Sequence, residues 1–224
     1  MDNVKDIRNK LVQEYLNENF VIDKTGVKTI EILAAQFIAD ENHIFRKPNE
    51  DYNKKELSWY LSQSLNVNDL EDTPKIWKQV ADPSGFINSN YGWCIFNKAN
   101  GLQYENCLAE LKRNSFTRRG VMIYTRPSMW TDYNKNGMQD FMCTWGVNYH
   151  IRNNELISIV QQRSQDALFG FNNDFAWQLY VSEKLSNDLN VKRGNIIWNN
   201  GSLHVYERHF PLINEYYENK VKTN

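Results

Sequence analysis

Hydrophobic residues recur along this chain with two periods, which divide it into helices and strands. A recurrence every three to four positions is typical of amphipathic helices, and alternation is typical of strands. The pattern predicts helices over 4–18, 51–64, 101–113, 174–189 and 211–219, and strands over 28–38, 120–125, 141–152 and 154–163, with one or two more within 194–207. Helices come first and strands follow with one long helix among them, which favours an α+β fold over a regular βαβ alternation.

The helical periods also predict which side chains face the core. Three of these helices have a clear apolar face. The expected buried residues are Leu57, Tyr60, Leu61 and Leu65 for the helix near 51–64, Tyr104, Cys107, Leu108 and Leu111 for 101–113, and Trp177, Val181 and Leu185 for 174–189.

Length and composition fit one globular domain over residues 1–224. The chain has 41% hydrophobic and 24% charged residues, with a formal net charge of -1, so no basic excess points to direct nucleic-acid binding. No stretch approaches the length of a membrane span. Cys94, Cys107 and Cys143 form no CxxC pair, which argues against a zinc or other metal site and a disulfide framework. A cytoplasmic location and no metal are therefore expected.

Known nucleotide-binding and hydrolase motifs are absent from the sequence. It contains no G-x-G-x-x-G, no P-loop, no H-E-x-x-H and no serine elbow. Candidate chemistry must therefore come from individual side chains.

Cys143 is the first such side chain. A thiol becomes a nucleophile when a nearby cation favours its thiolate. If the strands 141–152 and 154–163 form a hairpin with a turn centred near 153, Cys143 lies opposite Arg163. The alternative interpretation, which base rates favour for a lone cysteine, is a buried structural residue.

Two arginine-containing segments could bind an anion. Arg163-Ser164 offers a fork of donors and a hydroxyl, and Arg118-Arg119 offers a second fork. The alternative for each is a solvated surface.

Four further side chains have two interpretations each. Asp174 stands where the long helix is expected to begin, so it is a helix N-cap or a reader of a polar substrate edge. Glu56 is a solvated helical residue or, beside its apolar neighbours, a functional acid. His204 and Tyr206 would point the same way on a strand, as a core pair or as ligands of a sugar hydroxyl.

Together these residues resemble the thymidylate synthase family, and within it the phage deoxycytidylate (dCMP) hydroxymethylases. The resemblance covers nearly the whole chain. Its strongest stretches are 20–32, 73–77, 87–93, 122–129, 140–144, 163–164 and 202–206. It implies a mixed sheet flanked by helices and a homodimer packed through the sheets.

The resemblance implies a role for each matching residue. Cys143 matches the nucleophile that adds to C6 of a pyrimidine, Tyr91 a position close to it, and Glu56 the acid that organises water and proton transfer. The implied phosphate ligands are Lys24, Arg163 and Ser164, with Arg118 and Arg119 reaching the partner subunit's phosphate. His204 and Tyr206 match binders of the sugar 3′ hydroxyl, and Trp77 and Asp166 match positions lining the site of the co-substrate 5,10-methylenetetrahydrofolate.

Asp174 decides the expected substrate. The synthases have asparagine at this position, whose amide complements uracil, whereas a carboxylate accepts from the amino group of cytosine. The expected reaction is hydroxymethylation of dCMP at C5, in which water adds to an exocyclic methylene. Three alternatives stay open: methylation of dUMP, hydroxymethylation of CMP, and a non-enzymatic nucleotide-binding subunit.

Departures from the synthase pattern lie on both sides of the nucleophile. Met142 replaces the usual proline before it, and Thr144 replaces the usual histidine after it.

Overall fold

A mixed sheet of eight strands forms the framework of the computed structural model, which describes residues 1–222. Its order is β1 (Asp2–Asn3), β3 (Lys28–Ile38), β8 (Lys192–Tyr206), β6 (Glu155–Gln162), β5 (Thr144–Arg152) and β4 (Val121–Ile123), with β2 (Phe20–Ile22) beside β3 and β7 (Gln165–Asp166) beside β8. Strand β8 is antiparallel to β3 and parallel to β6. The α+β prediction is confirmed.

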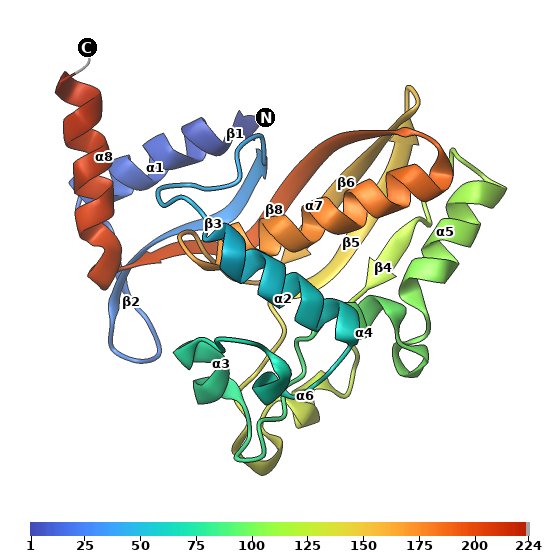
Figure 1. Cartoon of the computed structure of the whole chain (residues 1–224). Coiled ribbons are helices and arrows are strands. Elements are labelled where there is room, and N and C mark those ends of the chain that lie inside the picture. The colour runs from blue at the N-terminus through green and yellow to red at the C-terminus, as the bar shows by residue number, and fades with distance from the viewer. Residues whose placement is uncertain (223–224) are drawn as a thin grey trace.

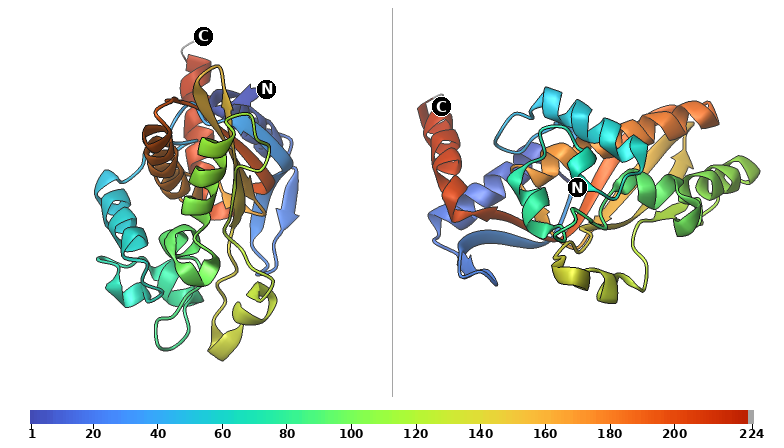
Figure 2. Two further views of the ribbon diagram at one scale, coloured as in Figure 1. Left: turned by 90° about the vertical axis from the view of Figure 1, so that its right-hand side faces the viewer. Right: turned by 60° about the horizontal axis from the view of Figure 1, so that its bottom comes forward.

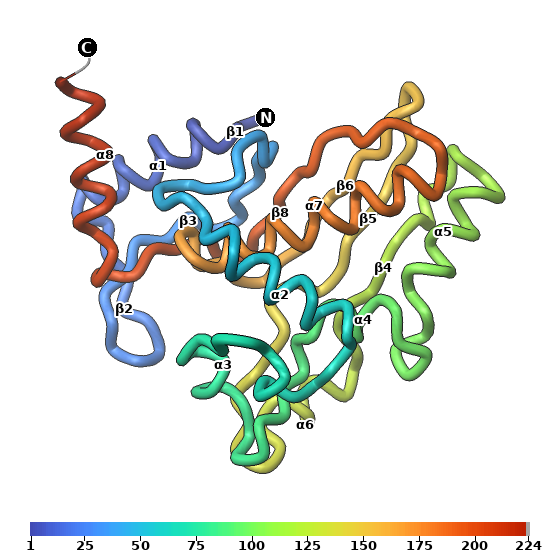
Figure 3. Tube along the Cα trace, viewed as in Figure 1, coloured from blue at the N-terminus to red at the C-terminus, as the bar shows by residue number. Residues whose placement is uncertain are grey.

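The long helix α7 (Gly170–Leu189) crosses one face of this sheet, with α2 (Glu50–Ser62) and α5 (Gln103–Arg113) beside it (Figures 1 and 2). Helices α1 (Val4–Leu16) and α8 (Phe210–Lys222) pack together near β3, as the Cα trace shows (Figure 3). The short helices are α3 (Lys75–Val80), α4 (Tyr91–Phe96) and α6 (Met129–Asp132). Within residues 1–222, none of the helices combines the length and apolar character needed to cross a bilayer.

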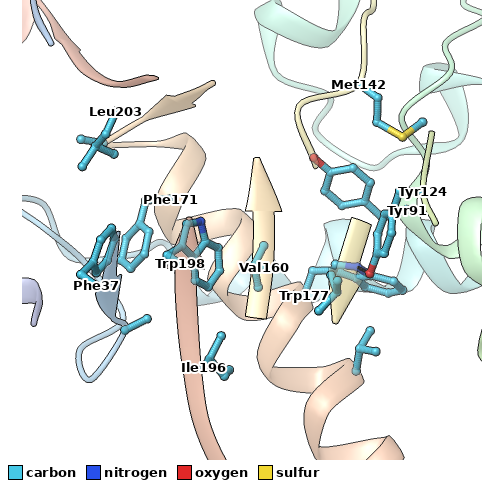
Figure 4. Packing of buried hydrophobic residues seen from close by; sticks show 14 of the residues in the cluster. Phe37, Tyr91, Tyr124, Met142, Val160, Phe171, Trp177, Ile196, Trp198 and Leu203 are labelled. Atoms are coloured by element: carbon cyan, nitrogen blue, oxygen red, sulfur yellow. Dashed lines mark hydrogen bonds between the residues drawn. The ribbon is translucent and has the colours of Figure 1, made fainter. Parts of the chain in front are cut away.

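Aromatic side chains fill the layer between sheet and helices. Trp198 of β8 packs edge-on against Phe171 of α7, with ring centroids 5.2 Å apart, and Phe171 contacts Phe37 of β3 (Figure 4). Trp177 and Tyr91 form a second group (Figure 4). Buried rings of this size dominate core stability, so this layer holds the sheet and α7 rigidly together.

The structure confirms most of the predicted elements and corrects two details. The apolar face of α2 was predicted only in part: Tyr60 is buried and Leu57 packs half-buried against the core, as expected, but Glu56 and Trp59 are also buried and Leu61 is 42% exposed. Trp59 packs against Trp77 and Tyr60 against Trp177, and this leaves Leu61 on the solvent side of the helix.

The start of the long helix was also misplaced. Helix α7 begins at Gly170 after Phe169, so Asp174 lies within its second turn and is not its N-cap. The Asp174 side chain therefore extends from the side of the helix and is available for contacts other than capping.

Strands β3 and β8 have an irregular backbone at two facing positions next to the candidate site. Ala34 of β3 has a left-handed φ of 53°, and Gly201 of β8 lies opposite it, between the register pairs on either side. A Cβ on Gly201 would lie 2.7 Å from the carbonyl oxygen of Arg163. Glycine at 201 therefore lets β8 approach the chain that carries Arg163.

Candidate active site

Cys143 and Arg163 meet at the open end of the β5–β6 hairpin. The backbone N–H of Arg163 donates to the carbonyl oxygen of Cys143 at 3.0 Å, and the guanidinium Nη2 lies 3.7 Å from Sγ. The guanidinium also donates to the carbonyl oxygens of Phe141 and Met142, at 2.6 and 3.0 Å. These bonds hold the cation beside the thiol.

This pairing depends on a β-bulge that the sequence pattern did not reveal. Arg152 pairs with Glu155 at the turn, and an unbroken register would place Cys143 opposite Ser164. The register shifts by one residue between Thr144 and Gly146, so Thr144 pairs with Gln162. Bulges often re-aim side chains in this way. The predicted juxtaposition of thiol and guanidinium is confirmed, although the turn centre lies later than 153.

The Cys143 thiol is mostly protonated in the free protein. Burial raises its pKa to about 11; Arg163 opposes this effect, whereas Asp174 and Asp140 add to it. Since the thiolate is the nucleophile, Arg163 increases the reactive fraction of this residue.

Asp174 lies in the same site and receives two amide donors. The side-chain Nε2 atoms of Gln162 and Gln165 donate to Asp174 Oδ2 at 2.8 and 3.0 Å. Burial raises the Asp174 pKa to about 6, while Gln165, Gln162 and Tyr91 lower it. The carboxyl is therefore ionised at neutral pH but close to its titration range.

Neither glutamine was predicted from the sequence. One signal existed for Gln162: its inward-facing partners along β6, Leu156, Ser158 and Val160, are buried, and the two-residue period extends to it. No local signal pointed to Gln165.

Glu56 is 3% exposed, which contradicts the interpretation as a solvated helical residue. Its Oε1 accepts from the Tyr52 hydroxyl at 2.5 Å and from the Trp77 indole at 3.2 Å. Burial raises the Glu56 pKa to about 7; the Tyr52 bond lowers it and the charge of Asp174 raises it. A carboxyl that titrates near neutral pH suits general acid–base work.

Tyr91 joins the α-helical and sheet sides of the site. Its hydroxyl accepts from Thr144 Oγ1 at 3.2 Å, and Gln162 Nε2 donates to the same Thr144 oxygen at 3.2 Å. Gly92 makes this position possible, because any Cβ there would clash with the Tyr60 carbonyl oxygen at 1.8 Å. Helix α4 can therefore press against α2 and hold Tyr91 beside Cys143.

The expected sugar-binding residues lie along β8, on the same side of the site. His204 and Tyr206 have ring centroids 5.0 Å apart, and Asp166 of β7 pairs with His204. The Tyr206 hydroxyl has a raised pKa because of burial and then of the charges of Asp166 and Asp23. Asp23 closes the β2–β3 turn by accepting from Thr25 and Val27, and the exposed Lys24 lies in that turn.

Three predicted anion ligands, Arg118, Arg119 and Ser164, make no side-chain hydrogen bond to Cys143 or Arg163 within residues 1–222. Arg118 and Arg119 are exposed after α5, and Arg119 pairs with Glu110 at 3.1 Å. Ser164 is half-buried directly after Arg163.

A thiol, an arginine and two carboxyls with raised pKa values thus lie close together at one end of this fold. The chain belongs to the thymidylate synthase family, whose model matches residues 8–224. It resembles the thermostable thymidylate synthase A from Bacillus subtilis with a TM-score of 0.71, at 22% identity over 95% of this chain and 83% of that one.

A particular branch of the family is more similar. The deoxycytidylate 5-hydroxymethyltransferase of Enterobacteria phage T4 is 54% identical over 223 residues, covering 96% of this chain and 91% of that protein. The enzyme of the same name from phage T2 is 54% identical over 222 residues, with 96% and 90% covered. A thymidylate synthase of Francisella tularensis is 27% identical over 220 residues, with 90% and 80% covered.

Proposed function

We propose that this protein hydroxymethylates C5 of dCMP in a folate-dependent reaction, giving 5-hydroxymethyl-dCMP. The observation that carries the choice of base is the carboxyl of Asp174, placed in the same site as Cys143 and supplied with N–H donors on Oδ2. The 54% identity to enzymes named deoxycytidylate 5-hydroxymethyltransferase supports the same reaction.

An ionised Asp174 distinguishes the two pyrimidines by hydrogen-bond chemistry. It accepts from the 4-amino group of cytosine, whereas the O4 atom of uracil offers only lone pairs. Binding of dUMP would therefore leave two buried acceptors facing each other. Such mismatches at polar sites give large discrimination, because desolvated groups stay unpaired.

Covalent activation falls to Cys143. Its thiolate adds to C6 of the base, and the electron pair of the C5–C6 bond then makes C5 nucleophilic. Arg163 favours the thiolate and, with Ser164 and Lys24, binds the nucleotide phosphate. His204 and Tyr206 orient the sugar through its 3′ hydroxyl.

Glu56 controls the step that separates hydroxymethylation from methylation. Before it, C5 bonds to the one-carbon unit and loses its proton, and tetrahydrofolate leaves with the electron pair of the broken C–N bond, which gives an exocyclic methylene on C5. The Glu56 carboxyl then directs a water molecule to this methylene carbon and accepts the proton that the water loses. Elimination of Cys143 then restores the aromatic ring. Tyr52 and Trp77 hold Glu56 Oε1, so the carboxyl has a fixed direction for this water.

The residues at the proposed folate site fit that co-substrate. Trp77 is half-buried with its indole N–H directed at Glu56, and Asp166 offers a half-buried carboxyl to the N–H groups of a pterin. When bound, 5,10-methylenetetrahydrofolate supplies a one-carbon unit at the oxidation level of formaldehyde. The reaction needs no metal, and we place it in the cytoplasm, of the host if a phage encodes the protein.

We also propose a homodimer packed through the sheets. The face opposite α7 carries a row of hydrogen-bonded amides that runs from Gln36 through Asn199 and Gln161 to Asn148. The strands also expose large apolar side chains: Leu33 is 69% exposed, and Ile123 and Trp145 are each 50% exposed. In such a dimer Arg118 and Arg119 would bind the partner subunit's phosphate.

Subunit complementation tests this arrangement. Cys143→Ser and Arg118→Glu proteins, each inactive, are unfolded, mixed and refolded together. Because half of randomly paired dimers are mixed and each has one intact site, about a quarter of wild-type activity should return. No recovery in mixed dimers would contradict the shared site.

Mass spectrometry of the product tests the function. The protein is incubated with dCMP, tetrahydrofolate and formaldehyde, with dUMP and CMP in parallel and the Cys143→Ser variant as control. A gain of CH2O by dCMP alone is expected. A gain of CH2 would show a methyltransferase, modification of dUMP or CMP instead would show a different substrate, and no modification would favour a non-enzymatic nucleotide-binding subunit.

A further inference from the structure

The Gln165 side chain lies between two buried groups whose chemistry fixes its orientation. Its Oε1 accepts from the Trp198 indole Nε1 at 2.8 Å, and its Nε2 donates to Asp174 Oδ2 at 3.0 Å. Gln165 is 2% exposed and Trp198 is fully buried.

An amide between such groups has only one satisfactory orientation. The indole N–H can only donate, so it requires the oxygen of Gln165. The amino end of Gln165 must then face Asp174. A flipped amide would place N–H against N–H and an oxygen against a carboxylate, which leaves buried groups unpaired at both ends.

This fixed donor acts on one oxygen of Asp174. Gln162 donates to the same atom, at 2.8 Å, so Oδ2 accepts two N–H groups. These two bonds favour the ionised carboxyl, and a proton that does bind Asp174 is directed to Oδ1.

We propose that Gln165, locked by Trp198, is a positioning residue for base selection: it fixes Oδ1 of Asp174 as the atom that faces the pyrimidine and disfavours a proton there. The inference rests on the proposed function. An ionised Oδ1 accepts from the amino group of cytosine, whereas a protonated Oδ1 would donate to O4 of uracil. Selectivity between the two bases therefore depends on the protonation of one carboxyl.

The direction of the pH dependence follows. Burial raises the Asp174 pKa to about 6, and Gln165 lowers it more than Gln162 does. Loss of Gln165 thus raises the pKa and extends acceptance of uracil towards neutral pH. The titratable groups that interact with Asp174 from the surrounding elements are Glu56, Tyr60, Tyr91, Tyr124 and Cys143. Glu56 titrates in the same range, but its charge affects the binding of both nucleotides similarly. Its effect therefore largely cancels in the ratio of the dCMP and dUMP affinities.

Calorimetric titration with dCMP and dUMP between pH 5 and pH 8 tests the proposal. In the wild-type protein the preference for dCMP should fall up to about tenfold per pH unit below pH 6. Gln165→Met should lower the preference at pH 7 roughly tenfold and move its decline to higher pH. Trp198→Phe should shift the profile in the same direction, because the Gln165 amide is then free to flip.

Two further variants make the test decisive. Gln178→Met is the matched control: it removes an amide that is 1% exposed one turn beyond Asp174 on α7, and it should leave the ratio and its pH dependence unchanged. Gln165→Glu keeps the side-chain shape and the bond from Trp198 but offers Asp174 an acceptor, so it should lose the preference more completely than Gln165→Met.

The outcomes separate this proposal from the proposed function. Folded Gln165→Met or Gln165→Glu protein with the wild-type ratio and pH profile would overturn the role of Gln165 alone. A wild-type protein that does not prefer dCMP at pH 7 would instead overturn the proposed function, and this inference with it.

Discussion

Replacing Asp174 with asparagine should reverse the preference for cytosine. Gln162 and Gln165 both present N–H groups at the position of Oδ2. An asparagine would satisfy them with its oxygen, and its amino group would take the place of Oδ1. That amino group complements O4 of uracil and opposes the amino group of cytosine.

The size of the effect can be worked out from the hydrogen bonds involved. Cytosine loses a bond to a charged acceptor, which contributes about 1.5–3 kcal/mol, and leaves a buried donor unpaired, which costs about 1–3 kcal/mol. The sum is about 2.5–6 kcal/mol, so kcat/KM for dCMP should fall roughly 10²–10⁴-fold. Activity on dUMP should rise, because uracil gains the donor that it lacked.

Competition between dCMP and dUMP in one reaction, with products separated by mass spectrometry, measures this ratio directly. Asp188→Asn is the matched control, because Asp188 lies near the other end of α7 and pairs with Tyr104 and Lys184. An Asp174→Asn protein that still prefers dCMP, while the control behaves as wild type, would refute the reasoning.

Three further changes have expected outcomes. Glu56→Gln should lower product formation at least about a hundredfold while dCMP still binds in calorimetry, and a fully active variant would remove Glu56 from the water step. The same variant should be more stable at pH 8 by up to about 3 kcal/mol in urea unfolding and unchanged at pH 4, because a carboxyl whose pKa is raised by folding destabilises the folded state as pH rises from its unfolded value of 4.5 towards about 7; equal effects at both pH values would contradict this. Arg163→Gln, which removes the charge, should shift the alkaline rise of Cys143 alkylation by iodoacetamide to higher pH, and an unchanged profile would show that Arg163 does not favour the thiolate. Gly201→Ala should cost about 1–3 kcal/mol of stability and lower activity, because its Cβ would displace the Arg163 carbonyl; wild-type values for both would contradict that contact.

Local sequence patterns predicted the elements of this fold well where hydrophobic periods are strong. Strand β3 spans the predicted residues, and Trp177, Val181 and Leu185 of α7 are buried as expected. The face of α2 was predicted only in part, because Leu57 and Leu61 repeat at helical spacing whereas contacts of Trp59 and Tyr60 with other aromatic rings decide which side is buried. The start of α7 was missed because Asp174 resembles an N-cap, whereas Phe169 precedes the helix without any side-chain cap.

The candidate site likewise contains contacts that the sequence predicted and contacts that it did not. The expected pairing of the two strands of a hairpin predicted that Cys143 lies beside Arg163, although a β-bulge shifts the strand register by one residue to bring them together. The groups that orient the carboxyls could not be predicted in full. Gln165 reaches Asp174 only because β7 pairs with β8, and Trp198 lies on that distant strand. Tyr52 was within reach of sequence reasoning, since it precedes Glu56 by one helical turn. The crossing of Arg118 to a partner subunit stays a prediction.

The central claim is a covalent bond between Cys143 and C6 of a cytosine nucleotide, and trapping that bond tests it most directly. The protein is incubated with 5-fluoro-dCMP and methylenetetrahydrofolate, because fluorine blocks the loss of the C5 substituent and should halt the reaction at the adduct. Intact-protein mass spectrometry should show one added nucleotide–folate unit, and peptide mapping should place it on Cys143 and not on Cys94 or Cys107. A protein that hydroxymethylates dCMP yet forms no adduct, or forms it at another residue, would contradict the account.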